Sequence, residues 1–261
     1  MNQSLQSIIN LQSHPLSDPS YQQQCKSELD THGVLLMPDF LTGSAIDSIL
    51  VDGDSNRDLA YFTASDHNVY LAPTDPDFAD DHPRNRCITS SKGCITTDQI
   101  PATSDLRPLY DSDVFRQFLC KVLNEKQLHE YADPLSSINL HYASEGQELG
   151  WHFDNSSFAI TLLIRRPLDG AHFEYVKNAR DADAGDMNYD GVKKILNGDV
   201  PVERLNMNAG DLVLFRGRNS IHRVTPTIGD ITRMLVVLAY NTEPGVSLSE
   251  SARMTFYGRL N

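Results

Sequence analysis

The stretch INLHYASEGQELGWHFDNSSFAITLLIR, residues 138–165, decides how the second half of the chain folds. It contains two short runs of β-type residues separated by turn residues, a pattern that predicts two strands. Working outward from it, four more runs of the same kind occur at 171–176, 203–207, 211–217 and 232–241. Six short strands within about 100 residues favour a sandwich or jelly roll. The expected fold class is therefore mainly β with flanking helices, an α+β chain.

The first half of the chain has a different pattern. Apolar residues at helical spacing and possible capping residues predict helices over 17–33, 43–53 and 112–125. An apolar run at 34–41, interrupted by Pro38, predicts a short strand between the first two helices. We therefore interpret this half as a helical scaffold.

Residues 68–104 are rich in Asp, Pro, Ser and Thr and show little periodicity, which predicts a long loop. Loops of this length in compact enzymes are commonly lids or substrate-binding segments, so Arg84, Arg86 and Lys92 are candidates for holding a substrate. A solvated surface loop fits the same composition. A second insertion, 177–201, interrupts the strands and predicts a short helix near 189–196 that could overhang a site.

We expect one domain over residues 1–261, in which 1–135 supply the helical scaffold and substrate loops and 136–261 form the catalytic core. The formal net charge of -13 and a pI near 5.0 oppose nucleic acid as a partner, because such binding relies on clustered basic residues. No apolar run approaches the roughly 20 residues of a membrane span. The first residues lack the features of a secretory signal, so the expected location is cytoplasmic.

Three residues have the spacing of a metal site. His152 and Asp154 are two residues apart, so their side chains point to the same face of an extended segment. His222 follows the GDLVLF run, and a jelly roll can bring it opposite the first pair. Two imidazoles and one carboxylate form the set typical of non-haem Fe(II) oxygenases. The alternative is that His-x-Asp is a common tripeptide and His222 an ordinary strand histidine.

Arg233 lies at the start of the apolar run TRMLVVLAY, which predicts that it is buried. An arginine is seldom buried without an anionic partner, since removing the guanidinium from water is costly. The distal carboxylate of 2-oxoglutarate would satisfy Arg233 through two charge-assisted hydrogen bonds. An internal Asp or Glu would satisfy it as well, and in isolation the two interpretations are comparable.

His152, Asp154, His222 and Arg233, in this order within β-type segments of residues 136–242, resemble the Fe(II)/2-oxoglutarate-dependent dioxygenase superfamily, especially its prolyl-hydroxylase-like branch. The wider chain is similar to small bacterial oxygenases and halogenases that act on free amino acids. The resemblance implies a double-stranded β-helix, a cupin-like jelly roll. It also implies Fe(II), 2-oxoglutarate and O₂ as cofactor and co-substrates.

The same resemblance implies that Tyr142 and Thr225 line the 2-oxoglutarate pocket, although either is equally well explained as a packing residue. His141 is adjacent to Tyr142 on one strand, so only one of the two can face the site, and we expect Tyr142 to do so. The radical halogenases carry Gly or Ala in place of the carboxylate ligand. Because Asp154 is present here, we expect hydroxylation rather than halogenation.

The expected reaction is hydroxylation of an unactivated C–H bond in a small molecule, a free amino acid or an amino-acid-derived metabolite, with release of succinate and CO₂. Candidate substrate contacts are Arg86, Asn155 and Glu174, with Glu174 holding an amine and Arg86 a carboxylate. Both could equally form ordinary ion pairs. The alternatives are an oxygenase acting on a protein side chain, a non-catalytic sensor that binds metal or 2-oxoglutarate, and a cupin-like hydrolase or isomerase.

Overall fold

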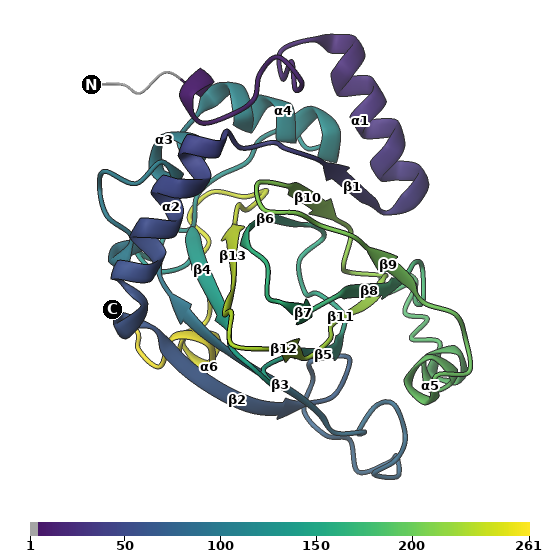
Figure 1. The fold of residues 1–261 in the computed structure, drawn as a ribbon. Coiled ribbons are helices and arrows are strands. Elements are labelled where there is room, and N and C mark those ends of the chain that lie inside the picture. The colour runs from purple at the N-terminus through teal and green to yellow at the C-terminus, as the bar shows by residue number, and fades with distance from the viewer. Residues whose placement is uncertain (1–4) are drawn as a thin grey trace.

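Two antiparallel sheets face each other across a central space in the computed structural model, which describes residues 5–261 (Figure 1). The larger sheet has the strand order β1-β10-β6-β13-β4-β3-β2, the smaller has β5-β11-β8-β9, and β12 pairs with β7. This arrangement is a jelly roll, so the predicted fold class is confirmed. The larger sheet comprises β1 (Val34–Met37), β10 (Leu212–Phe215), β6 (Ala159–Arg165), β13 (Arg233–Leu238), β4 (Ile138–Ala143), β3 (Ile88–Ile95) and β2 (Tyr61–His67). The remaining strands are β5 (Leu149–His152), β11 (Ile221–Val224), β8 (Phe173–Val176), β9 (Glu203–Leu205), β12 (Thr227–Ile228) and β7 (Asp169–Gly170).

Helices cover the outer face of the larger sheet (Figure 1). Each of the longer ones begins at a side-chain cap: Asp18, Thr42 and Ser112 each accept a backbone N–H of the first turn. Their apolar sides and the outward residues of the sheet form the main core, which excludes water from that face. The helices of this layer are α1 (Pro19–His32), α2 (Gly43–Ser55), α3 (Leu106–Tyr110) and α4 (Asp113–Leu123), with the short 3₁₀ turns η1 (Leu5–Ser7), η2 (Arg57–Leu59) and η3 (Thr97–Gln99).

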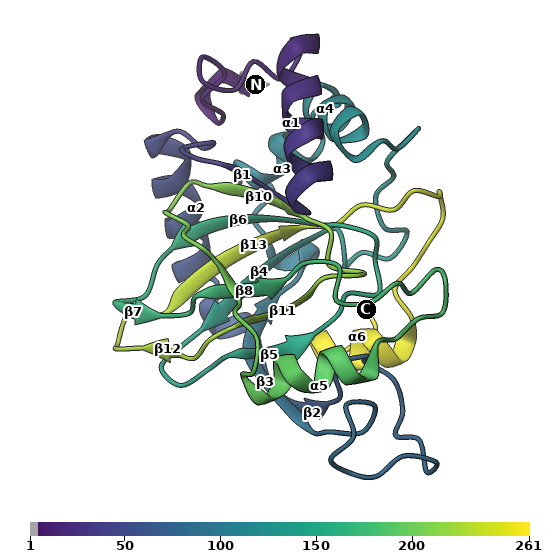
Figure 2. The ribbon, with the colours of Figure 1, turned by 90° about the vertical axis from the view of Figure 1, so that its right-hand side faces the viewer.

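The barrel formed by the two sheets has two distinct ends. Figure 2 shows β7 and β12 at one end, whereas α5 (Tyr189–Asn197), α6 (Glu250–Tyr257) and the loop between β2 and β3 lie toward the other. Strand β13 runs between these ends and begins, at Arg233, on the side of β7 and β12. None of the helices in residues 5–261 is long and apolar enough to cross a bilayer.

The insertion that carries α5 packs behind the smaller sheet. Val192 and Ile195 of α5 join Trp151, Phe153 and Ile221 of the sheet and its continuation in one buried cluster. The loop after β2 enters the same cluster, with the Tyr70 ring stacked on Phe153 at 5.5 Å and in edge contact with Tyr189 at 5.6 Å. We call this combination of loop and insertion the brace. The expectation that the insertion overhangs the site is therefore wrong.

Strands β2 and β3 and helices α3 and α6 were not predicted from the sequence. Strand β3 lies inside the stretch 68–104 that we expected to be a loop, because its composition is polar. Its polar residues have specific partners: the Ser90 hydroxyl accepts the Gly150 N–H at 3.0 Å, and the Ser91 N–H donates to the Glu148 carbonyl at 2.7 Å. The predicted helices before residue 126 and near 189–196 and the six predicted strands are confirmed.

Candidate active site

His152 and His222 lie directly opposite each other on β5 and β11. Their ring centroids are 4.1 Å apart, and Asp154 follows β5 on the same side. The Asp154 Oδ1 atom is 3.7 Å from Nε2 of His152 and 3.6 Å from Nε2 of His222. One ligand atom from each of the three side chains lies within 4.8 Å of the others, a spacing that could hold a metal ion. The pairing of β5 with β11 thus brings together residues 70 positions apart.

Backbone carbonyls set the orientation of both imidazoles. Nδ1 of His152 lies 2.8 Å from the Gly150 carbonyl, and Nδ1 of His222 lies 3.0 Å from the Ser220 carbonyl. Because a carbonyl can only accept, each Nδ1 carries the proton and each Nε2 presents a lone pair toward Asp154. Burial, with a further contribution from His222, holds the pKa of His152 well below its usual value. The rings are therefore neutral, as metal coordination requires.

Asp154 fits a metal site better than it fits any role within the protein. Its Oδ2 atom is buried and has no hydrogen-bond partner among the described residues. The side chain rests against Gly217, where an added Cβ would lie 1.8 Å from Oδ2, and the Asp154 N–H donates to the Gly217 carbonyl at 3.1 Å. A buried carboxylate oxygen without a partner is costly, so an ion bound between Asp154 and the two Nε2 atoms would stabilise it.

Arg180, from the insertion, links the two segments that carry the ligands. Its guanidinium lies 4.1 Å from the centre of the Phe153 ring and donates to the Asp154 carbonyl at 3.5 Å. Its Nε donates to the Arg218 carbonyl at 2.8 Å. Arg180 therefore positions the backbone on both sides of Asp154, a role that the sequence did not indicate.

The inner face of the larger sheet carries a group of basic side chains. Alternation and register place Arg233, His141 and Lys92 on this face, where Arg233 pairs across the ladder with the small Ala143. Arg233 is 8% exposed, and its side chain has no ion pair or hydrogen bond within residues 5–261. Burial lowers the pKa of Arg233 to about 10, so it stays charged at neutral pH. The internal carboxylate that could have explained this arginine is not present.

Lys92 and His141 form the second part of this group. The Lys92 Nζ atom is 3.4 Å from Nδ1 of His141 and 5.6 Å from the centre of the Phe256 ring on α6. Burial, followed by the charges of Lys92 and Arg233, holds the pKa of His141 well below its usual value. Burial also lowers the pKa of Lys92, and the negative charge of Asp154 acts in the opposite direction. Both groups lack an acidic hydrogen-bond partner in the part of the chain described.

The expectation that Tyr142 faces the site is wrong. Tyr142 is fully buried on the opposite face of β4, in the core beneath α2, and its hydroxyl donates to the Gly53 carbonyl at 2.7 Å. The strand has a buried face on each side, so a hydrophobic pattern did not distinguish the core from the site. His141 takes the inward position.

Two predicted substrate contacts are occupied elsewhere. Glu174 is 3% exposed on the outer face of β8, where its oxygens accept hydrogen bonds from Arg204 at 2.7 Å and Arg223 at 2.8 Å. Burial alone would raise the pKa of Glu174, but these two hydrogen bonds lower it. Arg86 donates to the Asn197 side chain at 2.8 Å and to the Leu196 carbonyl at the end of α5. Both expectations are wrong, because the two side chains belong to the outer layer.

Thr225 and Asn155 remain predictions. The Thr225 hydroxyl accepts the His172 N–H at 2.9 Å, which holds the end of β11 against the segment before β8. Asn155 is exposed beside Asp154, and its carbonyl accepts Arg218 Nη1 at 3.3 Å.

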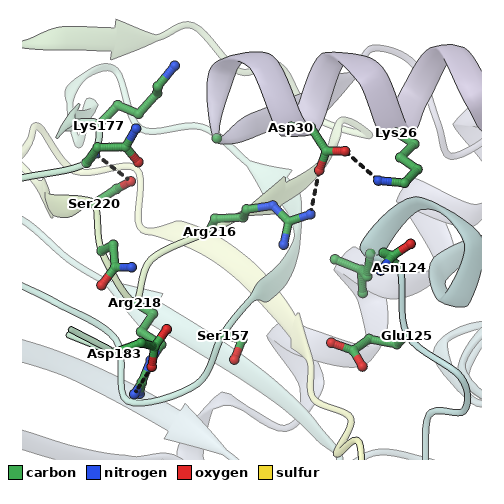
Figure 3. Close-up of a pocket in the computed structure, with 14 residues that line it drawn as sticks. Lys26, Asp30, Asn124, Glu125, Ser157, Lys177, Asp183, Arg216, Arg218 and Ser220 are labelled. Atoms are coloured by element: carbon green, nitrogen blue, oxygen red, sulfur yellow. Dashed lines mark hydrogen bonds and ion pairs between the residues drawn. The ribbon is translucent and has the colours of Figure 1, made fainter. Parts of the chain in front are cut away.

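A polar cavity of about 520 Å³ lies behind the ligand segments, between the ends of α1 and α4 and residues 216–220 (Figure 3). Several of its charged side chains pair with each other: Asp30 accepts from Lys26 and from Arg216, and Arg218 donates to Asp183 at 2.8 Å. Of the metal ligands, none lines this cavity. It is a surface network rather than the reaction chamber.

Residues 84–255 match a family model described as Halogenase D. The chain belongs to this family. The match extends over well more than half of the sequence, and it includes the triad, Arg233 and strand β3. No curated protein sequence matches the chain.

Solved structures of the same fold are similar to this Halogenase D family member. HygX from Streptomyces hygroscopicus, with nickel, 2-oxoglutarate and hygromycin B bound, is 14% identical with a TM-score of 0.56, and the match covers 90% of this chain and 95% of HygX. The non-haem α-ketoglutarate-dependent epimerase SnoN from nogalamycin biosynthesis is 12% identical with a TM-score of 0.60, covering 85% and 81%. A 2OG-Fe(II) oxygenase-family oxidoreductase from Burkholderia pseudomallei is 12% identical with a TM-score of 0.54, covering 87% and 93%.

At these identities the likeness establishes the fold, which is the double-stranded β-helix of the Fe(II)/2-oxoglutarate oxygenases. The predicted superfamily is confirmed, and the similarity to the halogenase group is confirmed by the family model. The predicted enzyme class and the predicted iron and 2-oxoglutarate agree with the family and with the triad.

Proposed function

We propose that this chain is an Fe(II)- and 2-oxoglutarate-dependent hydroxylase of a small, anionic metabolite, with His152, Asp154 and His222 as the iron ligands. The observation that carries the proposal is the buried, unpartnered Oδ2 of Asp154 beside two neutral, oriented imidazoles. Bound iron with 2-oxoglutarate and O₂ supplies the oxidising power, and succinate and CO₂ are released. The protein contributes binding, orientation and exclusion of water.

Arg233 is the proposed partner of the distal carboxylate of 2-oxoglutarate. It is a buried cation on the inner face, next to the small Ala143, and no side chain of residues 5–261 neutralises it. A carboxylate offers the guanidinium two parallel charge-assisted hydrogen bonds. Arg233 would thereby fix how far the opposite end of 2-oxoglutarate extends toward the triad.

Lys92 is the proposed anchor for a carboxylate of the substrate. Its ammonium lies on the inner face between His141 and Phe256, and neutral His141 cannot act as its counter-ion. A bound carboxylate would favour the charged form of Lys92 and offset the cost of burial. An amino acid or amino-acid-derived metabolite carries such a group, and these compounds are the substrate class that we propose. A protein side chain would lack a free carboxylate beside the oxidised carbon.

Halogenation is the second candidate, because the family model carries that name. Asp154 occupies the position that the halogenases leave to Gly or Ala, and Gly217 provides the space for its carboxylate. We therefore favour hydroxylation for this chain.

Succinate production from 2-oxoglutarate with Fe(II), O₂ and a panel of free amino acids tests the proposal, with product masses recorded in the presence of chloride. The expected product gains one oxygen. Lys92→Met should raise the KM of the stimulating compound by about 10-fold or more and leave that of the co-substrate nearly unchanged, whereas Arg233→Met should do the reverse. The proposal fails if no small acid stimulates turnover and His152→Ala binds Fe(II) as tightly as the wild type.

A further inference from the structure

A cavity of about 200 Å³ opens beside Arg233, and we call it the Arg233 cavity. Arg166, Gly170, His172, Phe173 and Arg233 contribute to its wall. Gly170 belongs to β7, so the cavity lies at the end of the barrel away from α5 and α6 (Figure 2). Part of its wall is inner barrel surface, because the Phe173 ring also lies 5.6 Å from the ring of His222. The cavity therefore connects the surface at β7 with the inner wall beside the metal site.

The charges of the Arg233 cavity are basic. Arg166, His172 and Arg233 line it, and of its described lining residues none is acidic. Asp169 is the acidic group beside it, with Oδ1 at 3.7 Å from Nε2 of His172. Arg166 is exposed and donates to the neutral Asn208 side chain at 3.1 Å, so no carboxylate holds its guanidinium.

This local charge contrasts with the protein as a whole. A net charge of -13 repels a dianion such as 2-oxoglutarate over most of the surface. Patches of opposite charge focus the field and raise the rate of association of a charged ligand. The Arg233 cavity supplies such a patch next to the residue that is the proposed partner of the co-substrate.

The position of Arg233 also suits passage through this cavity. A 2-oxoglutarate molecule that enters with its keto-acid end first would reach the triad while its trailing carboxylate meets Arg233. Arrival from the opposite end would require the distal carboxylate to pass the metal site before reaching Arg233. The order of groups along the barrel thus matches the orientation of the molecule when it comes from the side of β7.

We propose that the Arg233 cavity is an anion-binding port, through which short dicarboxylates, 2-oxoglutarate inward and succinate outward, exchange at the end of the barrel opposite to α5 and α6. The port rests on the proposed function, because it presupposes 2-oxoglutarate at Arg233. It separates the route of the co-substrate from that of the substrate, so 2-oxoglutarate exchanges while substrate is bound.

Anaerobic stopped-flow mixing of the Fe(II) protein with 2-oxoglutarate tests the port, with the visible absorption that a keto acid gives on chelating Fe(II) as the signal. Asn206 is an exposed residue of the cavity wall, so Asn206→Trp narrows the opening without disturbing the core. This variant should slow association and dissociation by the same factor and leave Kd unchanged, as expected for an obstructed passage. Saturating substrate should not prevent association in the wild type.

Charge is tested separately. Arg166→Glu should lower the association rate constant about 3- to 10-fold at low ionic strength, and the difference should shrink in high salt. Lys193→Glu, on exposed α5, makes the same change in net charge away from the port and is the matched control. Equal rates in Arg166→Glu and Lys193→Glu, or unchanged rates in Asn206→Trp, would overturn the port. Absence of the absorption band in the wild type would instead refute 2-oxoglutarate binding and with it the proposed function.

Discussion

Asp154 and Glu174 are two carboxylates on opposite sides of the same four-stranded sheet, and they differ in what satisfies them. Glu174, on the outer face, accepts hydrogen bonds from two arginines. Asp154, on the inner side, has one buried oxygen without a partner and another beside two imidazole nitrogens. The paired carboxylate is explained by the fold alone. The unpaired one requires a ligand, so partner satisfaction separates a structural charge from a functional one.

The same comparison applies to the arginines. Arg204 and Arg223 are held by Glu174, and Arg223 also lies 4.8 Å from the centre of the Trp151 ring. Arg233 is more deeply buried and has no such partner among residues 5–261. A buried cation without a counter-ion is costly for folding, and its presence is accounted for when a bound anion supplies the missing charge.

The largest effect is expected for Asp154→Gly. Losing a direct ligand costs more than the 10- to 100-fold typical of residues that only support a ligand, so hydroxylation should fall by about 1000-fold or more. Product masses with chloride present measure both hydroxylation and any halogenation. Glu174→Gln is the control and should hydroxylate at close to the wild-type rate. Full hydroxylase activity in Asp154→Gly would mean that another carboxylate binds the metal.

The next effect is expected for Gly217→Ala. The new Cβ would lie 1.8 Å from Oδ2 of Asp154, so the carboxylate must move and metal affinity should fall about 10- to 100-fold. Titration of the metal-free protein with Co(II), followed by visible absorption, measures this affinity. Gly43→Ala adds a Cβ where no atom lies within 4 Å and is the matched control. In the Asp154→Gly background, Gly217→Ala should cause no further loss, and an additional loss would show that Gly217 acts in another way.

Glu174→Gln should affect stability rather than chemistry. Removing the charge leaves two arginines less well compensated beside a buried group, which should lower the free energy of unfolding by about 3 kcal/mol. The affinity for the co-substrate should stay within about 2-fold of the wild-type value. Urea denaturation and steady-state kinetics measure the two quantities. A large loss of co-substrate affinity with unchanged stability would break the distinction between the two carboxylates.

The smallest effect concerns pH and His141. The pKa of His141 is held well below its usual value of about 6.5, by burial and then by the facing Lys92 and Arg233. As the pH falls below about 6.5, the unfolded chain binds a proton that folded His141 does not, so stability decreases. His141→Gln should remove about 1 kcal/mol of the loss between pH 7.5 and 5.5 in the metal-free protein. Exposed His32→Gln is the control, and equal slopes in all three proteins would contradict the assignment.

The sequence predicted the triad because a period of two places His152 and Asp154 on one side, and because the run of strands implied a jelly roll. It did not predict which of His141 and Tyr142 faces inward, since both faces of β4 are buried, one by helices and one by the site. The role of Glu174 depends on two arginines from other strands, and their pairing is set by register. Strand β3 was missed because its polar residues serve β5 and the site rather than solvent.

The brace has a consequence for how the enzyme can change during evolution. Its loop and insertion pack on each other and on Phe153, which lies between the ligands His152 and Asp154 in the chain. Sequence drift in these outer segments therefore reaches the first coordination sphere through a single aromatic ring. Altering the depth of the Phe153 socket would tune how firmly the iron ligands are held, without replacing any residue inside the barrel.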